Sequence, residues 1–240
     1  MDVGKTAAVL KSLKVPPFRL AQVRRAVFGA AVSSYEEATV LPMELRRLLE
    51  REAPILSLSL RSLAVCADGR ARKAALALCD GKVVETVLLR PSTRRWTACL
   101  SSQAGCAYAC AFCATGLMGP GRGLTAEEMT DQVLFWRQHM RREGLEGRLD
   151  NVVYMGMGEP LANYENVSAS LKSLLDQKQF GIGARHIAVS TVGLPAEMER
   201  FGEDFPQLNL ALSLHAAEDV LRTKLVPANR AYPLAALARA

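Results

Sequence analysis

From Trp96 onward, short apolar segments alternate with segments of helical periodicity, and this alternation most narrowly limits the fold of the chain. We expect strands at 97–100, 151–155, 186–190 and 208–214. Between the first two, Thr125-x-x-Glu128 has the form of a capping box at the start of an amphipathic helix, and a second helix is expected over 164–174. Repeated strand and helix units form parallel sheets covered by helices. The sequence therefore predicts an α/β fold with parallel strands over 96–240.

The residues before Trp96 have two other patterns. Residues 1–55 read as helical, around a capping-box signal at Ser34-x-x-Glu37, and we expect a small helical accessory domain there. Residues 56–95 are β-rich, and Asp80-Gly81 between two apolar runs predicts a β-hairpin extension, with a connector over 90–95. We assign 96–240 to the α/β core.

The net charge of +6 is unevenly distributed. Residues 1–99 hold 17 Lys and Arg against 9 Asp and Glu, whereas residues 100–240 hold 13 against 15. Basic groups such as Arg24-Arg25, Arg46-Arg47, Arg70 to Lys73 and Arg94-Arg95 favour an RNA partner, although each group alone is equally typical of a solvated face. No uncharged apolar run of 18 residues occurs, so we expect a cytoplasmic protein with no membrane partner.

Three cysteines lie within eight residues, at Cys106, Cys110 and Cys113. Such a group can hold three irons of a cubane cluster and leave the fourth iron open to an exogenous ligand. Zinc would need a fourth ligand, and no His or Cys at finger-like spacing supplies one. Ordinary core or surface thiols are the third interpretation.

Ligand-binding residue types follow the other expected strands. These are Gly158 and Glu159 after 151–155, Ser190 at the end of 186–190, and Ser213 with His215 at the end of 208–214. In parallel α/β folds the ligand lies beyond the carboxyl ends of the strands. We therefore expect one binding site formed by these residues and the cysteine loop.

Several longer motifs resemble the RlmN/Cfr family of RNA adenine methyltransferases, which are radical S-adenosylmethionine (SAM) enzymes. They are the run Cys106-x-x-x-Cys110-x-x-Cys113, Gly156-Met-Gly-Glu-Pro-Leu161, Ser190-Thr-x-Gly193 and Leu212-Ser-Leu-His-Ala216. The likeness runs from about Pro17 to the last residue. It implies a partial (β/α) radical SAM barrel.

The resemblance also implies an activity and its residues. Cys106, Cys110 and Cys113 would bind a 4Fe-4S cluster, and SAM would be contacted by Gly158, Glu159, Ser190, Ser213, Leu214 and His215. Glu85 would accept a proton, and Cys99 would resolve a protein–RNA crosslink by forming a transient disulfide. The implied reaction is methylation of adenine carbon 2 in 23S rRNA, at the peptidyl-transferase centre, and in tRNA, 3′ of the anticodon. The implied partners are these RNAs and an electron donor of the flavodoxin or ferredoxin class, and we expect a monomer.

One departure from the family limits this expectation. The family carries a methyl-bearing cysteine and a SAM-contacting asparagine well after the Ser-Leu-His motif, and its barrel has six strands, whereas no cysteine follows Cys113 here. We expect an incomplete core with an open strand edge at 208–214, in a chain that binds iron but does not methylate RNA alone. The alternatives are carbon 8 methylation, a non-catalytic RNA-binding or assembly protein with a structural cluster, and a radical SAM enzyme with another substrate.

Overall fold

The strands of the chain pair side by side in sequence order to form one sheet. The computed structural model describes residues 1–91 and 95–240, and among these the sheet has seven strands. They are β1 (Leu58–Val65), β2 (Ala71–Leu78), β3 (Val83–Leu89), β4 (Arg95–Cys99), β5 (Arg148–Tyr154), β6 (Ile187–Thr191) and β7 (Asn209–Leu212). Strands β1 to β4 pair antiparallel, and β4 to β7 pair parallel. The expected α/β fold with parallel strands in the C-terminal part is confirmed, and all four expected strands are present.

The β-rich region is a three-stranded meander that continues the parallel sheet. The expected Asp80-Gly81 turn joins β2 to β3, with Gly81 at a φ of 81° and the Leu78 N–H donating to the Lys82 carbonyl at 2.8 Å. Strand β3 then pairs with β4, and Val87 lies opposite Cys99. Of the connector expected over 90–95, residues 92–94 lie outside the described residues, as does Arg94 of the Arg94-Arg95 pair.

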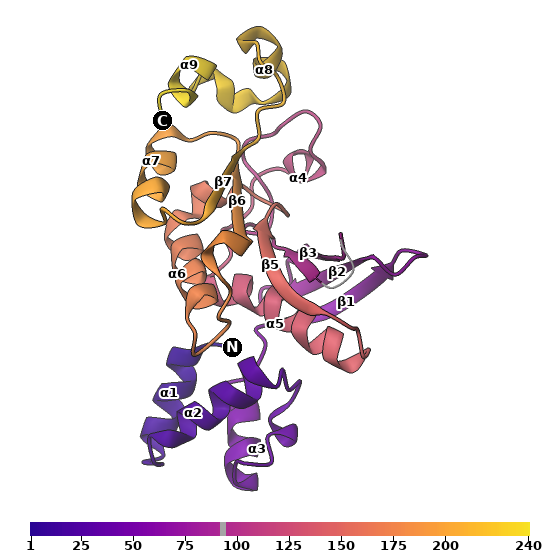
Figure 1. Cartoon of the computed structure of the whole chain (residues 1–240), viewed down its shortest axis with the longest axis vertical. Coiled ribbons are helices and arrows are strands. Elements are labelled where there is room, and N and C mark those ends of the chain that lie inside the picture. The colour runs from indigo at the N-terminus through magenta and orange to yellow at the C-terminus, as the bar shows by residue number, and fades with distance from the viewer. Residues whose placement is uncertain (92–94) are drawn as a thin grey trace.

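The residues before the sheet are helical, as expected. Helix α1 (Val3–Ser12) is followed by α2 (Phe18–Arg24), which continues into a π-helical turn (Arg25–Gly29), and by α3 (Met43–Glu52). These helices gather at one end of the molecule (Figure 1). The expected capping box at Ser34 starts only a 3-10 turn, Tyr35–Glu37. Its partner Glu37 accepts instead from the Ser33 N–H at 2.8 Å, and Pro42 begins a separate helix soon afterwards.

Helices cover one face of the sheet. The longest is α5 (Ala126–Arg142), which begins with the expected capping box of Thr125 and Glu128. The fully buried Trp136 of α5 donates its indole N–H to the Thr86 hydroxyl at 3.0 Å, which places α5 against β3. Because side chains alternate along a strand, Val84, Thr86 and Leu88 face α5, while Glu85 and Val87 face the other side.

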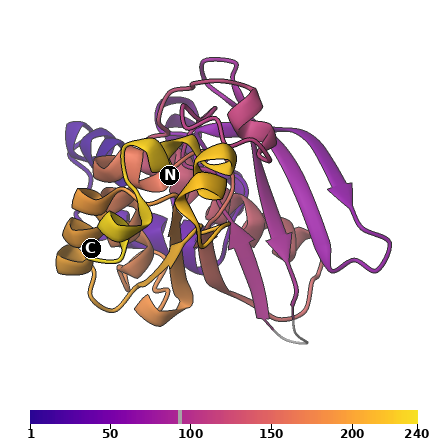
Figure 2. The same cartoon turned by 90° about the horizontal axis from the view of Figure 1, so that it is seen from above.

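The remaining helices complete this layer and the far end of the molecule. They are α4 (Ala114–Leu117), α6 (Tyr164–Leu175), α7 (Pro195–Asp204), α8 (Asp219–Leu225) and α9 (Leu234–Leu237), with 3-10 turns at Pro160–Asn163, Ala184–His186 and Pro227–Arg230. Helices α4, α8 and α9 lie at the end opposite α1 to α3 (Figure 1). Viewed from above, β1 and β2 extend away from the helices (Figure 2). Within 1–91 and 95–240, no helix is long and apolar enough to cross a membrane.

We expect Leu88→Ala to lower the free energy of unfolding by about 2–5 kcal/mol, because it leaves a cavity where a fully buried side chain packs under α5. Its neighbour Leu89 is 38% exposed, so Leu89→Ala serves as the matched control, with an expected change within about 0.5 kcal/mol. Urea unfolding followed by circular dichroism measures both. Equal losses in the two variants would contradict the assignment of the buried face.

Candidate functional site

The carboxyl ends of β4 to β7 meet at one edge of the sheet, and the expected ligand-binding segments extend from this edge. The parallel register places Cys99 beside Val153, Val153 beside Ala188, and Ser190 beside Ala211. Beyond it, the Leu100 N–H donates to the Val153 carbonyl at 2.8 Å. The structure therefore brings the segments that follow the four strands to the same end of the molecule, as the sequence predicted.

The cysteine loop lies directly before α4. The Cys106 N–H donates to the Gly119 carbonyl at 2.9 Å, and the Cys113 N–H donates to the Cys110 carbonyl at 3.0 Å. Ala109 adopts a left-handed φ of 47°, which turns the chain sharply between the first two cysteines. Cys110 is buried, whereas Cys106 and Cys113 are partly exposed. The loop thus presents three free thiols from a tightly bonded backbone.

The pKa values of Cys106 and Cys110 depend on neighbouring thiols and on Glu159. Burial raises the pKa of Cys106 and of Cys110, and both values are raised further by Glu159 and Cys113. In the described part of the chain, no three His, Cys, Asp or Glu side chains converge on a single metal ion. A cubane cluster does not need this convergence, because each thiolate binds a different iron. A set of three soft sulfur donors in one short loop fits an iron-sulfur cluster.

Glu159 joins the segments after β5 and β6. Its buried carboxylate accepts from the Leu161 N–H at 3.0 Å and from the Val192 N–H at 2.8 Å. Burial raises the pKa of this carboxyl, and the hydrogen bonds from Val192 and Leu161 lower it. Because each carboxylate oxygen accepts more than one hydrogen bond, Glu159 can hold its loops and still accept from a ligand ammonium.

Gly158 is required by a close approach of the chain to Gln103. Its φ is 97°, and a Cβ at this position would lie 2.5 Å from the Gln103 Cβ. The Gln103 side chain in turn accepts from the Glu159 N–H at 2.8 Å. The glycine therefore lets the segment after β4 pack against the segment after β5.

The segments after β6 and β7 meet each other and the cysteine loop. The Ser190 and Ser213 hydroxyls are hydrogen-bonded at 2.9 Å. His215 has a left-handed φ of 59°, and its ring lies 4.3 Å from the ring of Phe112 between two of the cysteines. Leu214, which lies between Ser213 and His215 in the sequence, is 41% exposed. Ser190 and Ser213 thus lie together, and His215 lies against Phe112 of the cysteine loop.

Glu85 and Cys99 lie on the sheet face opposite α5. Val87 pairs directly with Cys99, so Glu85, two residues before it, points to the same side. The Glu85 carboxylate forms an ion pair with Lys73 of β2 at 2.9 Å, and both side chains are about half exposed. Burial raises the pKa of the Cys99 thiol. The two candidates share a face but have different environments.

Ser101, which no sequence pattern indicated, links Glu85 to Met157 in the segment after β5. The Ser101 hydroxyl donates to the Glu85 carbonyl at 2.5 Å and accepts from the Met157 N–H at 2.9 Å. Ser101 is fully buried. No local sequence pattern distinguishes it from the neighbouring Ser102.

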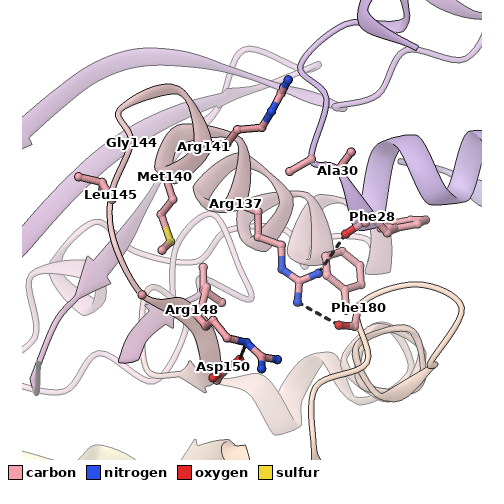
Figure 3. A pocket seen from close by; sticks show the side chains of 14 residues that line it. Phe28, Ala30, Arg137, Met140, Arg141, Gly144, Leu145, Arg148, Asp150 and Phe180 are labelled. Atoms are coloured by element: carbon pink, nitrogen blue, oxygen red, sulfur yellow. Dashed lines mark hydrogen bonds and ion pairs between the residues drawn. The ribbon is translucent and has the colours of Figure 1, made fainter. Parts of the chain in front are cut away.

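A cavity of about 580 Å³ lies away from these residues, between the helical N-terminal region and α5 (Figure 3). Arg137 spans it, donating to the carbonyls of Phe28 at 3.4 Å and of Phe180 at 2.9 Å. Its wall includes Arg148, the first residue of β5, so it lies at the amino end of the parallel strands. None of the candidate site residues lines it, and we place the candidate site at the carboxyl ends on chemical grounds.

Comparisons with known proteins agree with this geometry. No protein-family profile matches the chain. The chain is 40% identical to a probable dual-specificity RNA methyltransferase RlmN of Chloroflexus aurantiacus, over 98% of this chain and 63% of that protein. It is 38% identical to the ribosomal RNA large subunit methyltransferase Cfr of Lachnoclostridium phytofermentans, over 94% of this chain and 64% of that protein.

A solved structure is also similar. The crystal structure of a radical SAM methyltransferase from Sphaerobacter thermophilus superposes with a TM-score of 0.91 and 38% identity, covering 100% of this chain and 69% of that one. The chain spans 63% and 64% of the length of the two curated relatives above.

We expect Cys99 to be alkylated by iodoacetamide several-fold more slowly than the exposed Cys79 at pH 8. Burial limits access to Cys99 and raises its pKa, and the thiolate is the reactive form. Because its pKa is raised, the alkylation rate of Cys99 should keep rising as the pH is increased above 8. Peptide mass spectrometry measures both sites in one sample, and equal rates would show that Cys99 is not buried.

Proposed function

We propose that this chain, which belongs to the RlmN/Cfr family of radical SAM methyltransferases, carries the cluster and cofactor sites for methylating carbon 2 of adenine in RNA. The observation that supports this proposal is the three-cysteine loop, which follows β4 and contacts His215 through Phe112 at the edge where the parallel strands end. The proposed substrates are 23S rRNA and tRNA, and the proposed location is the cytoplasm.

The target carbon explains the need for a cofactor. Carbon 2 of adenine lies between two ring nitrogens and is too electron-poor to attack the methyl group of SAM directly. When bound, a 4Fe-4S cluster with SAM supplies one-electron chemistry for such a carbon. Cys106, Cys110 and Cys113 would hold the cluster. The loop leaves coordination positions for the SAM amine and carboxylate, because it offers three thiols rather than four.

The strand ends would bind the rest of SAM. Glu159 would accept from its ammonium, and the Ser190–Ser213 hydroxyl pair would donate to its polar groups. Gly158 allows the close backbone approach, and Leu214 with His215 would contact the adenosine part. These contacts would orient the cofactor.

Glu85 and Cys99 would act on the RNA from the face of the sheet opposite α5. The Glu85 carboxylate would accept the proton that leaves adenine carbon 2, and Lys73 forms an ion pair with this carboxylate at 2.9 Å. The Cys99 thiol would supply the sulfur that closes the transient disulfide. Its proposed partner is a methyl-carrying cysteine, and none follows Cys113 in the 240 residues.

The proposed RNA partner fits the charge distribution. Residues 1–99 hold 17 Lys and Arg against 9 Asp and Glu, which suits contact with RNA phosphates. The cluster would need an electron donor of the flavodoxin or ferredoxin class. We propose a monomer.

Anaerobic reconstitution tests the cluster assignment. We expect about four irons per chain, and we expect Cys110→Ser to lose most of them because one of three thiolate ligands is removed. Cys79→Ser removes an exposed thiol outside the loop and is the matched control, with unchanged iron. Equilibrium binding of SAM should require iron. Full iron in Cys110→Ser would refute the site, and RNA binding that persists without iron while SAM binding is absent would favour an RNA-binding protein.

We expect the isolated 240-residue chain, loaded with its cluster, not to methylate RNA, because no cysteine after Cys113 is present to carry the methyl group. Transfer of a labelled methyl group from SAM to 23S rRNA fragments and tRNA measures this. A relative that carries the downstream cysteine is the positive control. Turnover by the chain alone would contradict the proposal and favour a radical SAM enzyme that needs no methyl-carrying cysteine.

A further inference from the structure

A fully buried arginine in α8 lies at the same end as the candidate site and belongs to none of its expected residues. Arg222 has 0% exposure. Its guanidinium donates to the Val192 carbonyl at 2.5 Å, to the Leu214 carbonyl at 3.1 Å and to the Asn229 side-chain oxygen at 2.7 Å. All three acceptors are uncharged. Arg222 therefore ties the turns after β6 and β7 to α8 without a direct counter-charge.

Burying a cation in this way has a cost. Moving a charge out of water is unfavourable unless hydrogen bonds and an opposite charge compensate for it. Burial lowers the pKa of Arg222, and the exposed carboxylate of Asp219 and the thiol of Cys110 oppose this. An arginine stays protonated at neutral pH. The positive charge is therefore present, and it would favour a negatively charged form of Cys110 in the loop.

The backbone connects α8 to the cysteine loop. The Ala111 N–H, directly after Cys110, donates to the Leu225 carbonyl at the end of α8 at 2.9 Å. Phe112, the next residue, packs on His215, whose neighbour Leu214 accepts from Arg222. Figure 1 shows α8 and α4 at the same end of the molecule. The helix that carries Arg222 and the turn to which Arg222 donates thus both contact the cysteine loop.

We propose that Arg222 is a positioning residue whose buried positive charge favours the reduced form of the cluster held by Cys106, Cys110 and Cys113. A 4Fe-4S cluster with three thiolates has a net charge of −1, and one electron from a low-potential donor protein makes it −2. A nearby cation stabilises the more negative state more strongly, and a buried one is little screened by water. The inference rests on the proposed function, because it assumes the cluster.

A purely structural role makes a different prediction. If Arg222 only ties the turns together, its charge is irrelevant, and substitutions should matter through the lost hydrogen bonds alone. Lysine keeps the charge but donates with different geometry, whereas glutamine keeps a donor and loses the charge. The reduction potential of the cluster separates the two roles, because it responds to charge.

The test is a redox titration of the reconstituted 240-residue chain with dithionite, followed by electron paramagnetic resonance of the reduced cluster. We expect Arg222→Gln to shift the midpoint potential to more negative values and Arg222→Lys to stay close to the wild type. Lys224→Gln removes a charge from the exposed side of the same helix and is the matched control, with no more than a small shift. Iron content and circular dichroism confirm loading and folding.

A second variant covers the case in which Arg222→Gln does not fold. Asp219→Asn keeps the oxygen that accepts from the Asn229 amide and the Leu234 N–H, but removes the carboxylate that partly offsets Arg222. Its midpoint potential should shift in the positive direction. An unchanged potential in Arg222→Gln, or in Asp219→Asn where the first variant does not fold, would overturn the inference, as would equal shifts in Arg222→Gln and Arg222→Lys. A chain that binds no iron would instead refute the proposed function itself.

Discussion

The parallel register of β4 to β7 is the constraint on which the candidate site depends. It brings four strand ends to one edge, so that side chains distant in sequence meet beyond it. The Glu159 contact with the Val192 N–H and the Ser190–Ser213 hydroxyl pair both cross between neighbouring strands. Because side chains alternate along a strand, a slip of one residue in β6 would turn Ser190 to the opposite face. The register therefore positions candidate site residues as well as the strands.

Two buried charged groups share one residue at this edge. The Val192 N–H donates to Glu159, and the Val192 carbonyl accepts from Arg222. A buried carboxylate and a buried guanidinium are thus hydrogen-bonded to the same residue of the turn after β6.

The sequence predicted the parts of the structure that have a local signal. Alternating apolar segments predicted the strands, Thr125 and Glu128 predicted the start of α5, and Asp80-Gly81 predicted the hairpin. The capping box predicted at Ser34 does not form, because the Glu37 carboxylate accepts from the Ser33 N–H instead. A separate helix begins after Pro42. Ser101 and Arg222 were missed because their contacts span 16 or more residues or link separate loops, and no periodic pattern records such contacts. The site residues assigned by family resemblance remain predictions.

The antiparallel pairing of β3 with β4 has a consequence for the evolution of this region. Glu85 is placed by the register of Val87 with Cys99 and by the Ser101 hydroxyl, rather than by the length of chain that joins the two strands. Residues can therefore be gained or lost in that connection without moving the carboxylate relative to the cysteine thiol. The length of the connection between β3 and β4 can therefore vary among related sequences while the geometry of Glu85 and Cys99 is kept.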